Sequence, residues 1–399
     1  MTVPGPTGYL LTSYGDMIVN EPRMSAYATA LRQAITPGCK VLDIGAGPGI
    51  FALLACQFGA GSVVAIDPHD SILLVNEAAR SNGFDDRIKI VHDLSSAYSS
   101  DRRAEVIISD LRGILPLFEG HIPAVIDARE RLMAPGGTLI PVRDTLHIAL
   151  VDHEASYAGF ERPWLDNSYD IDLSVGHRFA VNRYVKVVLG REDLLSESAH
   201  LLTLDYTTIS DPNVSATAEL TAVRDGTAHG FVVWFDAELG PSIGFSNAPG
   251  EPEQVYGQCF FPFERPIELA TGDSVTVELR ADHIAGSYVW SWNSSARRAG
   301  HETPVTFRQS TFRGTIMTPA RLAALSPNHV PSALTEHEVD RHCLSLFDGV
   351  TSLKKVARLL AAKFPDQFAD NADAFGHASR LAQRYKSTTA DRDEDNNRR

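Results

Sequence analysis

Residues 41–49 read VLDIGAGPG, and this stretch decides the fold class. It includes most of a short apolar run, residues 40–44, and leads into residues 50–58, whose apolar composition suits a helix. Glycines between a strand and a helix leave backbone N–H groups and the positive end of the helix dipole facing a ligand. A dinucleotide-binding turn has the spacing G-x-G-x-x-G, which would require a glycine where Ile50 stands. The stretch therefore predicts a strand, a glycine loop and a helix whose spacing differs from the dinucleotide one.

The alternation of strand and helix continues to residue 142. A helix expected over residues 71–82 ends at Gly83, where a left-handed cap fits. The turn at residues 135–137 (PGG) leads into the last strand. The other expected elements are strands at 62–66, 88–91, 106–109 and 138–141 and a helix at 123–133. Repeated βα units with short loops predict a parallel, doubly wound, Rossmann-like α/β sheet.

Beyond residue 143 the expected strands follow one another without helices between them. They are residues 183–189, 201–209, 216–224, 230–239, 274–281 and 287–292. Turn signals such as Asp225-Gly226 and Gly272-Asp273 separate them. This part predicts an antiparallel β-barrel or sandwich.

The C-terminal part returns to helical spacing. Leu353, Val356, Leu360 and Phe364 recur at helical intervals behind a cap at residues 351–352. The expected organisation is an N-terminal helical lid (1–37), a Rossmann-like domain (38–142), a β-barrel domain (143–323), a linker (324–335), a small helical module (335–387) and a disordered polar tail (388–399).

Composition excludes several classes of protein. The chain has 399 residues and a formal net charge of −14, so no overall positive field is present to hold a nucleic-acid backbone. Four cysteines, at 39, 56, 259 and 343, lie too far apart for a zinc knuckle or a redox pair, so we expect reduced thiols and no metal. Neither a signal-peptide pattern nor an apolar run of about 20 residues is found. We therefore expect a cytoplasmic protein that contacts neither nucleic acid nor membrane.

The glycine loop resembles the first motif of class I S-adenosylmethionine (SAM) methyltransferases. It has the spacing G-x-G-x-G, with Asp43 two residues ahead of it. Asp67 ends the next expected strand, where an acid accepts hydrogen bonds from both hydroxyls of a ribose. We therefore expect SAM as the cofactor, with a dinucleotide or a purely structural turn as alternatives. The expected cofactor-binding residues here are Asp43, Gly45, Gly47, Gly49, Asp67, Pro68, Asp93 and Leu94.

A longer resemblance, to the protein arginine methyltransferases, covers most of the chain. Met17-Ile18 with Arg23 and Tyr27 resembles the family's N-terminal helix signature. Residues 109–119 align without a gap on its double-glutamate loop. Further similar segments are Ala128-Arg129, Pro141, residues 164–174, residues 248–252 and Gln258. The chain is identified as a divergent, bacterial-type member of this family.

The resemblance implies a role for each matching residue. Arg23 would bind the SAM carboxylate, and Asp43 with the loop glycines would hold the methionine moiety. Asp110 and Glu119 match the family's two glutamates and would be the catalytic pair. Such a pair neutralises a guanidinium and aims one nitrogen at the sulfonium methyl group. The family's barrel arm, after residues 164–174, implies a homodimer.

The chain departs from the family around the methyl acceptor. Asp110 is one methylene shorter than glutamate, a retreat of about 1.5 Å, and a misplacement of about 1 Å can lower a rate about 10²-fold. Arg112 stands at an apolar position, where its guanidinium would occupy or neutralise the acid pair, or recruit an anionic group of the substrate. Residues 254–256 replace the family's Thr-His-Trp with Gln-Val-Tyr, which leaves Tyr256 as an aromatic face.

Structural interpretations compete with these functional ones. Tyr14 and Met17 are the other substrate candidates, although Tyr14 is equally well explained as a core residue. The competing roles are a turn cap for Asp110, a solvated first-turn acid for Glu119, a surface residue for Arg23, barrel packing for Tyr256 and a helix-end residue, in place of a general base, for His121.

The first hypothesis is a SAM-dependent N-methyltransferase acting on a guanidino nitrogen of a peptide, a protein or free arginine. One alternative keeps the enzyme but uses a hydroxyl, carboxylate or other amine as acceptor in natural-product or peptide maturation. Another is a non-catalytic SAM- or peptide-binding scaffold. Residues 343–350 resemble winged-helix peptide-binding domains of PqqD type, which implies a leader peptide as partner, with a packing appendage as the alternative.

Overall fold

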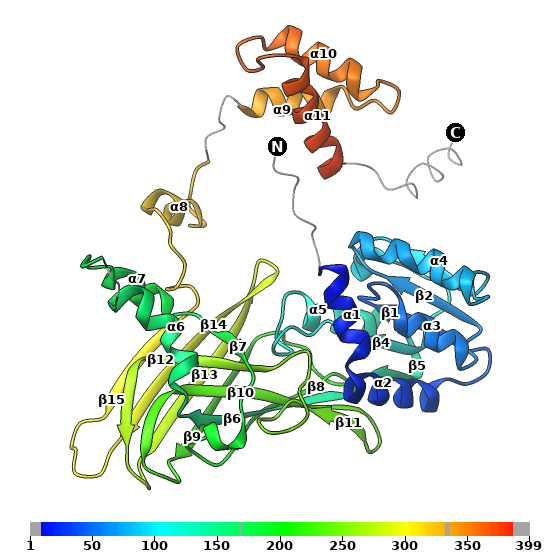
Figure 1. The fold of residues 1–399 in the computed structure, drawn as a ribbon. Coiled ribbons are helices and arrows are strands. Elements are labelled where there is room, and N and C mark those ends of the chain that lie inside the picture. Colours follow the sequence, from blue (N-terminus) through cyan, green and yellow to red (C-terminus); the bar gives the residue numbers. More distant parts are fainter. Residues whose placement is uncertain (1–8, 167–168, 332–335, 386–399) are drawn as a thin grey trace. The chain divides into compact units, whose positions relative to one another are not determined.

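The computed structural model describes residues 9–166, 169–331 and 336–385. They divide into two compact units, one ending at Ile316 and one beginning at Met317. The first unit contains all of the described strands, and the second contains only helices among its described residues (Figure 1). Within the described residues, no helix is both long and apolar enough to cross a membrane.

A parallel sheet forms the N-terminal part of the first unit (Figure 1). Its strand order is β3-β2-β1-β4-β5, and each neighbouring pair is parallel. The strands are β1 (Lys40–Ile44), β2 (Ser62–Ile66), β3 (Ile88–Val91), β4 (Ala104–Ser109) and β5 (Met133–Ile140). The first three have the bounds expected from the sequence, and in β1 every residue is buried, as both-face burial of a parallel strand requires.

Helices complete the predicted Rossmann-like α/β layer. They are α1 (Leu11–Val19), α2 (Glu21–Ala34), α3 (Ile50–Gln57), α4 (Leu74–Ser81) and α5 (His121–Asp127). The helix expected over residues 71–82 is divided into a 3-10 turn at Asp70–Leu73 and α4, and Gly83 follows it with a φ of 70°. The helix expected at 123–133 begins two residues earlier and winds its last turn, Ala128–Leu132, as a π-helix.

The strand order locates a ligand crevice. From β1 the chain crosses to β2 on one side, whereas β4 and β5 lie on the other side of β1. Ligands of open α/β sheets bind outside the carboxyl ends of the strands at such a reversal of direction. Gly45 directly follows β1 and Asp110 directly follows β4, so the topology places both residues at this crevice.

Two antiparallel sheets make up the rest of the first unit, as the barrel prediction expected. Their orders are β7-β12-β10-β6-β8, with β11 paired to β10, and β15-β14-β13-β9. The strands are β6 (Arg143–Val151), β7 (Val185–Val187), β8 (Ala199–Asp205), β9 (Val214–Thr221), β10 (Gly226–Gly240), β11 (Ile243–Ser246), β12 (Gln258–Leu269), β13 (Ser274–Ile284), β14 (Ser287–Arg297) and β15 (Val305–Ser310). Two short helices, α6 (Glu154–Leu165) and α7 (Ser174–Ala180), are inserted after β6.

Strand β12 was not expected, because Pro262 and Pro266 interrupt its apolar run. The structure accommodates both prolines at an irregularity. Ala228 of β10 pairs with Ile267, and Gly230 pairs with Pro262, so extra residues of β12 bulge out between the two pairs. The freed carbonyl of Pro262 accepts hydrogen bonds from Trp292 Nε1 (3.2 Å) and Gln309 Nε2 (3.0 Å).

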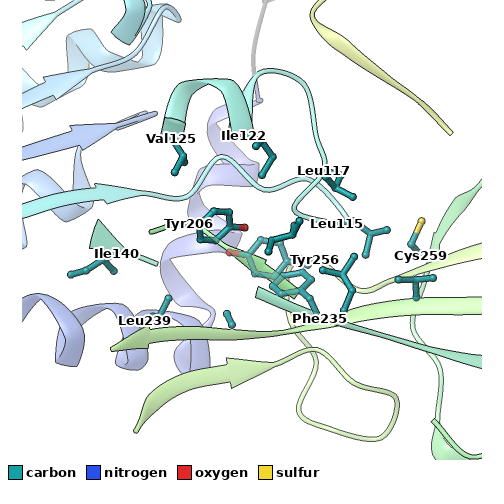
Figure 2. Close-up of a cluster of buried hydrophobic side chains, with 14 of the residues drawn as sticks. Leu115, Leu117, Ile122, Val125, Ile140, Tyr206, Phe235, Leu239, Tyr256 and Cys259 are labelled. Atoms are coloured by element: carbon teal, nitrogen blue, oxygen red, sulfur yellow. The ribbon is translucent and has the colours of Figure 1, made fainter. Parts of the chain in front are cut away.

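One hydrophobic core joins the parallel sheet to the β-sheets. Figure 2 shows Leu115, Leu117, Ile122 and Val125, from the segment that follows β4, close to residues of the β-sheets. Phe235 of β10 lies on the far side of this cluster, and Tyr256 lies between (Figure 2). This shared core fixes Tyr256, which belongs to the barrel part, beside the crevice of the parallel sheet.

The second unit is a small helical module. Its helices are α8 (Pro319–Ala324), α9 (Glu336–Ser345), α10 (Leu353–Lys363) and α11 (Asn371–Tyr385). The predicted cap is present, since Ser352 Oγ accepts a hydrogen bond from the Lys355 amide (3.4 Å). Val339, Cys343 and Leu360 belong to its core. The module has no strand among its described residues, so the wing of a winged helix is missing there, and the predicted disordered tail lies outside the described residues.

Candidate active site

A pocket lies over the carboxyl ends of β1, β2 and β4, between the glycine loop and the N-terminal helices. The pocket lining includes these residues singled out from the sequence: Tyr14, Met17, Arg23, Gly45, Asp67, Pro68, Asp93, Leu94, Asp110, Arg112, Glu119 and Tyr256. Asp43, Gly47 and Gly49 do not belong to the lining. Tyr9, His69, Phe118 and His121 line it without having been predicted as site residues. Each of them lies close in sequence to Asp67, to Glu119 or to the N-terminal signature, and this is the signal from which they could have been predicted.

The glycines of the loop are required by its backbone and by close neighbours. Gly45, Gly47 and Gly49 have φ of 74°, 49° and 85°, in the left-handed region that side chains disfavour. A Cβ on Gly47 would lie 2.6 Å from Tyr14 Cε1, and one on Gly45 would lie 2.1 Å from Leu111 Cδ2. The loop is therefore covered from two sides, by α1 and by the segment after β4. Tyr14 is only partly buried, so it is a lining residue and not a core one.

Asp67 is oriented by the loop itself. Its carboxylate accepts hydrogen bonds from the backbone amides of Gly47 and His69, both at 2.8 Å, and only 4% of the residue is exposed. Asp93, after β3, accepts a hydrogen bond from the Leu94 amide (2.7 Å). Two carboxylates thus stand at successive strand ends, where hydroxyl or amino groups of a nucleoside can reach them.

Asp43 lies beneath the loop and not in the pocket. It is 1% exposed. Burial raises its pKa from 3.8 to about 7, and hydrogen bonding by the backbone of Ala52 opposes this only partly. Its position at the end of β1 makes it a buried support for the loop, whereas the resemblance had implied contact with the methionine moiety.

The Asp43 carboxyl predicts a pH effect on stability. Its folded-state pKa lies above the unfolded value, so between about pH 4 and pH 7 the folded state holds a proton that the unfolded state has lost. The stability of the fold therefore falls as the pH rises through this window. Asp43→Asn removes the titration, so the variant should gain up to about 4 kcal/mol over the wild type at pH 8 and nothing near pH 4. Urea unfolding at both pH values measures this, and a difference independent of pH would contradict it.

Arg23 and Asp110 form a buried ion pair. Arg23 Nη2 lies 2.6 Å from Asp110 Oδ2, and Arg23 Nε donates to the same oxygen (2.8 Å). The Tyr256 hydroxyl donates to Asp110 Oδ2 (2.6 Å) and accepts from Arg23 Nε (3.0 Å). Arg23 is 4% exposed, so its interpretation as a surface arginine is wrong. Burial alone would raise the pKa of Asp110, but Arg23 and Arg112 hold it below the usual value.

Arg112 belongs to a second buried pair. Its Nε and Nη2 donate to the two oxygens of Asp144, each at 2.7 Å, and both side chains are fully buried. Its Nη1 donates to the Tyr27 hydroxyl (2.5 Å) and to Asp110 Oδ1 (3.1 Å). The Tyr206 hydroxyl also donates to Asp144. Arg112 therefore neutralises part of Asp110 while Asp144 holds the planar fork of its guanidinium.

Glu119 is the exposed member of the acid pair. It lines the pocket with a φ of 41°, which is uncommon outside glycine and is concentrated at functional sites. Tyr9 lines the same pocket, and burial and then the charges of Asp110 and Glu119 raise its pKa. The structure thus brings the two acids to one pocket, with Asp110 at its floor and Glu119 in contact with solvent. The described residues contain no cluster of acidic, histidine or cysteine side chains that could hold a metal ion.

Two family models and several known proteins match the chain. Residues 142–287 match a family model described as the arginine methyltransferase oligomerization subdomain, and residues 25–140 match the ribosomal protein L11 methyltransferase (PrmA) model. Protein arginine N-methyltransferase 1 of Dictyostelium discoideum is 27% identical over 65% of this chain and 79% of its own length. Arginine N(omega)-methyltransferase of Streptomyces achromogenes subsp. streptozoticus is 29% identical over 66% of this chain and 74% of its own length.

Solved structures show the same fold. The Trypanosoma brucei PRMT1 enzyme-prozyme heterotetrameric complex with AdoHcy covers 74% of this chain and 96% of its own with a TM-score of 0.68 at 21% identity. Arabidopsis thaliana protein arginine methyltransferase 10, in an open conformation, covers 75% of this chain and 97% of its own with a TM-score of 0.66 at 20% identity. None of these comparisons supports the PqqD-type resemblance of the C-terminal module.

A glycine loop of this spacing at the switch point of a five-stranded parallel sheet, followed by the antiparallel barrel, defines a class I SAM-dependent methyltransferase. Within that class, the chain is similar to the protein arginine methyltransferases, through the oligomerization-subdomain match over residues 142–287 and the two relatives named above.

Proposed function

We propose that the chain transfers a methyl group from SAM to a guanidino or related nitrogen of a peptide, a protein or free arginine. The observation that supports this most is the meeting of the donor crevice with two carboxylates, Asp110 and Glu119, in one pocket. The named activity of the relatives from Dictyostelium and Streptomyces points to the same acceptor.

The residues present fit the proposed donor. Side chains at Gly45 and Gly47 would collide with Leu111 and Tyr14, which line the pocket, so the left-handed glycine loop keeps these two lining residues in place. Asp67 would accept the ribose hydroxyls, and apolar Leu94 with Pro68 would cover the base. SAM supplies an electrophilic methyl group on a positively charged sulfur. Arg23 would bind the donor carboxylate, which requires Arg23 to share or leave its contact with Asp110.

The acceptor side would work by charge and orientation. Asp110 and Glu119 would hold the acceptor cation and aim one nitrogen at the methyl group, a placement that contributes much of the rate in such transfers. The nitrogen lone pair forms the N–C bond as the C–S bond breaks and sulfur keeps that electron pair. The nitrogen then releases a proton, for which exposed Glu119 offers a route to solvent.

A second candidate is methyl transfer to another amine, a hydroxyl or a carboxylate. It is favoured by one observation, the occupation of Asp110 by three donors, which are Arg23, Arg112 and Tyr256. An acid bound in this way has less capacity for a guanidinium than a carboxylate without such donors.

The experiment is incubation with methyl-labelled SAM and, separately, arginine, arginine-containing peptides and a cell extract. Label on a guanidino nitrogen, lost in an Asp110→Ala/Glu119→Ala variant, supports the first candidate. Label on a different group supports the second. Tight binding of SAM by calorimetry without turnover on any acceptor would point to a scaffold, and failure to bind SAM would overturn the whole proposal.

We further propose that the chain forms a homodimer through the α6–α7 arm. The oligomerization-subdomain match covers this segment, and the Trypanosoma brucei relative is a heterotetramer. Leu165 and Val175 on the arm expose apolar side chains, as do Leu10 and Leu11 at the N-terminal helix. Such surfaces cover each other in a symmetric pair of chains. A cytoplasmic location stays a prediction, with which the four buried, free cysteines are compatible.

The dimer predicts a specific loss. Val175→Glu places a charge on the arm and should convert the dimer to a monomer in size-exclusion chromatography with light scattering. Val223→Glu, at an exposed valine outside α6 and α7, is the matched control and should stay dimeric. A wild-type chain that is monomeric at every concentration tested would contradict the proposal.

A further inference from the structure

A short loop after β3, residues 93–98, forms part of the pocket wall. Asp93, Leu94 and Ser95 belong to the lining, and the loop turns back through a 3-10 turn at Ser95–Ala97. Leu94 is apolar, 57% exposed and part of the lining, so it is available to an apolar face of a bound molecule. The position of this 93–98 loop therefore decides the shape of one side of the pocket.

Arg131 holds the 93–98 loop from outside the pocket. Its Nη2 donates a hydrogen bond to the carbonyl oxygen of Ser95 (2.9 Å), and its Nη1 donates to that of Tyr98. Among the described residues, no other side chain from outside the loop donates a hydrogen bond to it. Arg131 itself does not belong to the pocket lining. A wall of the pocket is thus fastened by a residue that lies behind it.

The guanidinium of Arg131 is fixed from the helix side as well. Its Nε and Nη2 donate to the two oxygens of Asp127, at 2.9 Å and 2.7 Å. Such a two-point pair orients the planar fork of an arginine. Arg131 also lies in the π-helical turn Ala128–Leu132, and π-turns are rare and frequent at functional sites. The guanidinium is therefore held in place toward the loop before any ligand binds.

We infer that Arg131 is a positioning residue for the methyl donor, which keeps the 93–98 loop in place and so sets the affinity for the nucleoside half of SAM. This rests on the proposed function, since it concerns the donor of that reaction. A wall that is ordered before binding spares the ligand the free energy of ordering it. Arg23 would bind the carboxylate at the other end of the donor. The two arginines therefore act on separable halves of one ligand.

Calorimetry with two ligands separates the halves. S-adenosylhomocysteine contains the nucleoside and the amino-acid part, whereas 5′-methylthioadenosine contains the nucleoside without the carboxylate. We expect Arg131→Met to raise the dissociation constants of both ligands by the same factor, about tenfold, because each must now order the loop. Arg23→Ala should weaken only S-adenosylhomocysteine. A loss in Arg131→Met that is confined to S-adenosylhomocysteine would overturn the inference.

Arg129→Met is the matched control. Arg129 lies in the same π-helical turn and also donates to two backbone carbonyls, those of Tyr206 (2.8 Å) and Ile209 (2.6 Å), but neither of these residues lines the pocket. This variant should leave both dissociation constants unchanged even where its melting temperature falls. Equal weakening of both ligands in Arg129→Met and Arg131→Met would reduce Arg131 to a structural role and overturn the inference.

A conservative variant and hydrogen exchange complete the test. Arg131→Lys keeps the charge and can reach one carbonyl, so it should recover part of the lost affinity. In the protein without ligand, the amides of residues 94–98 should exchange faster in Arg131→Met than in the wild type. If the wild type binds S-adenosylhomocysteine and Arg131→Met binds it equally well, only the inference is overturned. If the wild type does not bind it, the proposed function is overturned as well.

Discussion

Arg112→Met is expected to lower the free energy of unfolding by about 3–5 kcal/mol, the usual cost of breaking a buried ion pair on one side. Arg112 and Asp144 are both fully buried and share two hydrogen bonds of 2.7 Å. Without the guanidinium, the Asp144 carboxylate keeps the hydroxyl of Tyr206 but loses its counter-charge. Urea denaturation at neutral pH measures the loss. If Arg112 only blocked an ancestral acceptor site, the same variant would stay stable and gain arginine methylation.

Two controls make the outcome specific to burial. Arg162→Met makes the same substitution in an exposed ion pair, Arg162 with Glu154, and should change the free energy of unfolding by less than about 1 kcal/mol. Arg112→Met combined with Asp144→Leu replaces both charges with apolar groups and should recover much of the loss, because no uncompensated charge remains. A double variant as unstable as Arg112→Met alone would contradict the ion-pair account.

The pairing of Arg112 with Asp144 also marks the limit of sequence-based prediction here. Strands β1, β2 and β3 were predicted to the residue, because short apolar runs between glycines and loops describe buried parallel strands well. Arg112 was correctly singled out as unusual, yet its partner lies 32 residues away, on the first strand of the antiparallel sheets. Local spacing contains no information on that contact.

The same limit applies to the rest of the site. The resemblance placed Arg23, Asp110 and Tyr256 at one site. It did not predict that the three side chains contact each other, and Arg23 and Tyr256 lie 233 residues apart in the sequence. His121 was interpreted as a helix-end residue and does begin α5, but its burial and its place in the pocket lining depend on contacts that its neighbours in sequence do not disclose. Which buried charges pair with each other depends on the tertiary fold, so these pairings could not be predicted from the sequence.

The largest effect on activity is expected from Asp110→Asn. The substitution keeps the shape of the side chain and removes the charge at the floor of the pocket, so kcat/KM for the acceptor should fall by about 10²-fold or more. Glu119→Gln is the matched control. Glu119 is exposed and screened by solvent, so its loss should cost less, about tenfold. Initial rates with saturating SAM measure both, after thermal melting has shown that each variant is folded.

Donor affinity distinguishes this role of Asp110 from a general collapse of the site. In the structure Asp110 and Tyr256 occupy Arg23, to which the donor carboxylate would bind. Asp110→Asn removes the competing charge, so the dissociation constant for SAM should stay equal or fall, whereas Arg23→Ala should raise it. If the Asp110→Asn variant transferred methyl groups at the wild-type rate, Asp110 would have no role in binding the acceptor. If Asp110→Asn and Arg23→Ala both lost SAM binding, the Arg23–Asp110 pair would serve only to bind the donor. A carboxylate that binds the acceptor and competes for Arg23 predicts the opposite pattern, in which Asp110→Asn weakens the affinity for the acceptor and leaves that for SAM equal or higher.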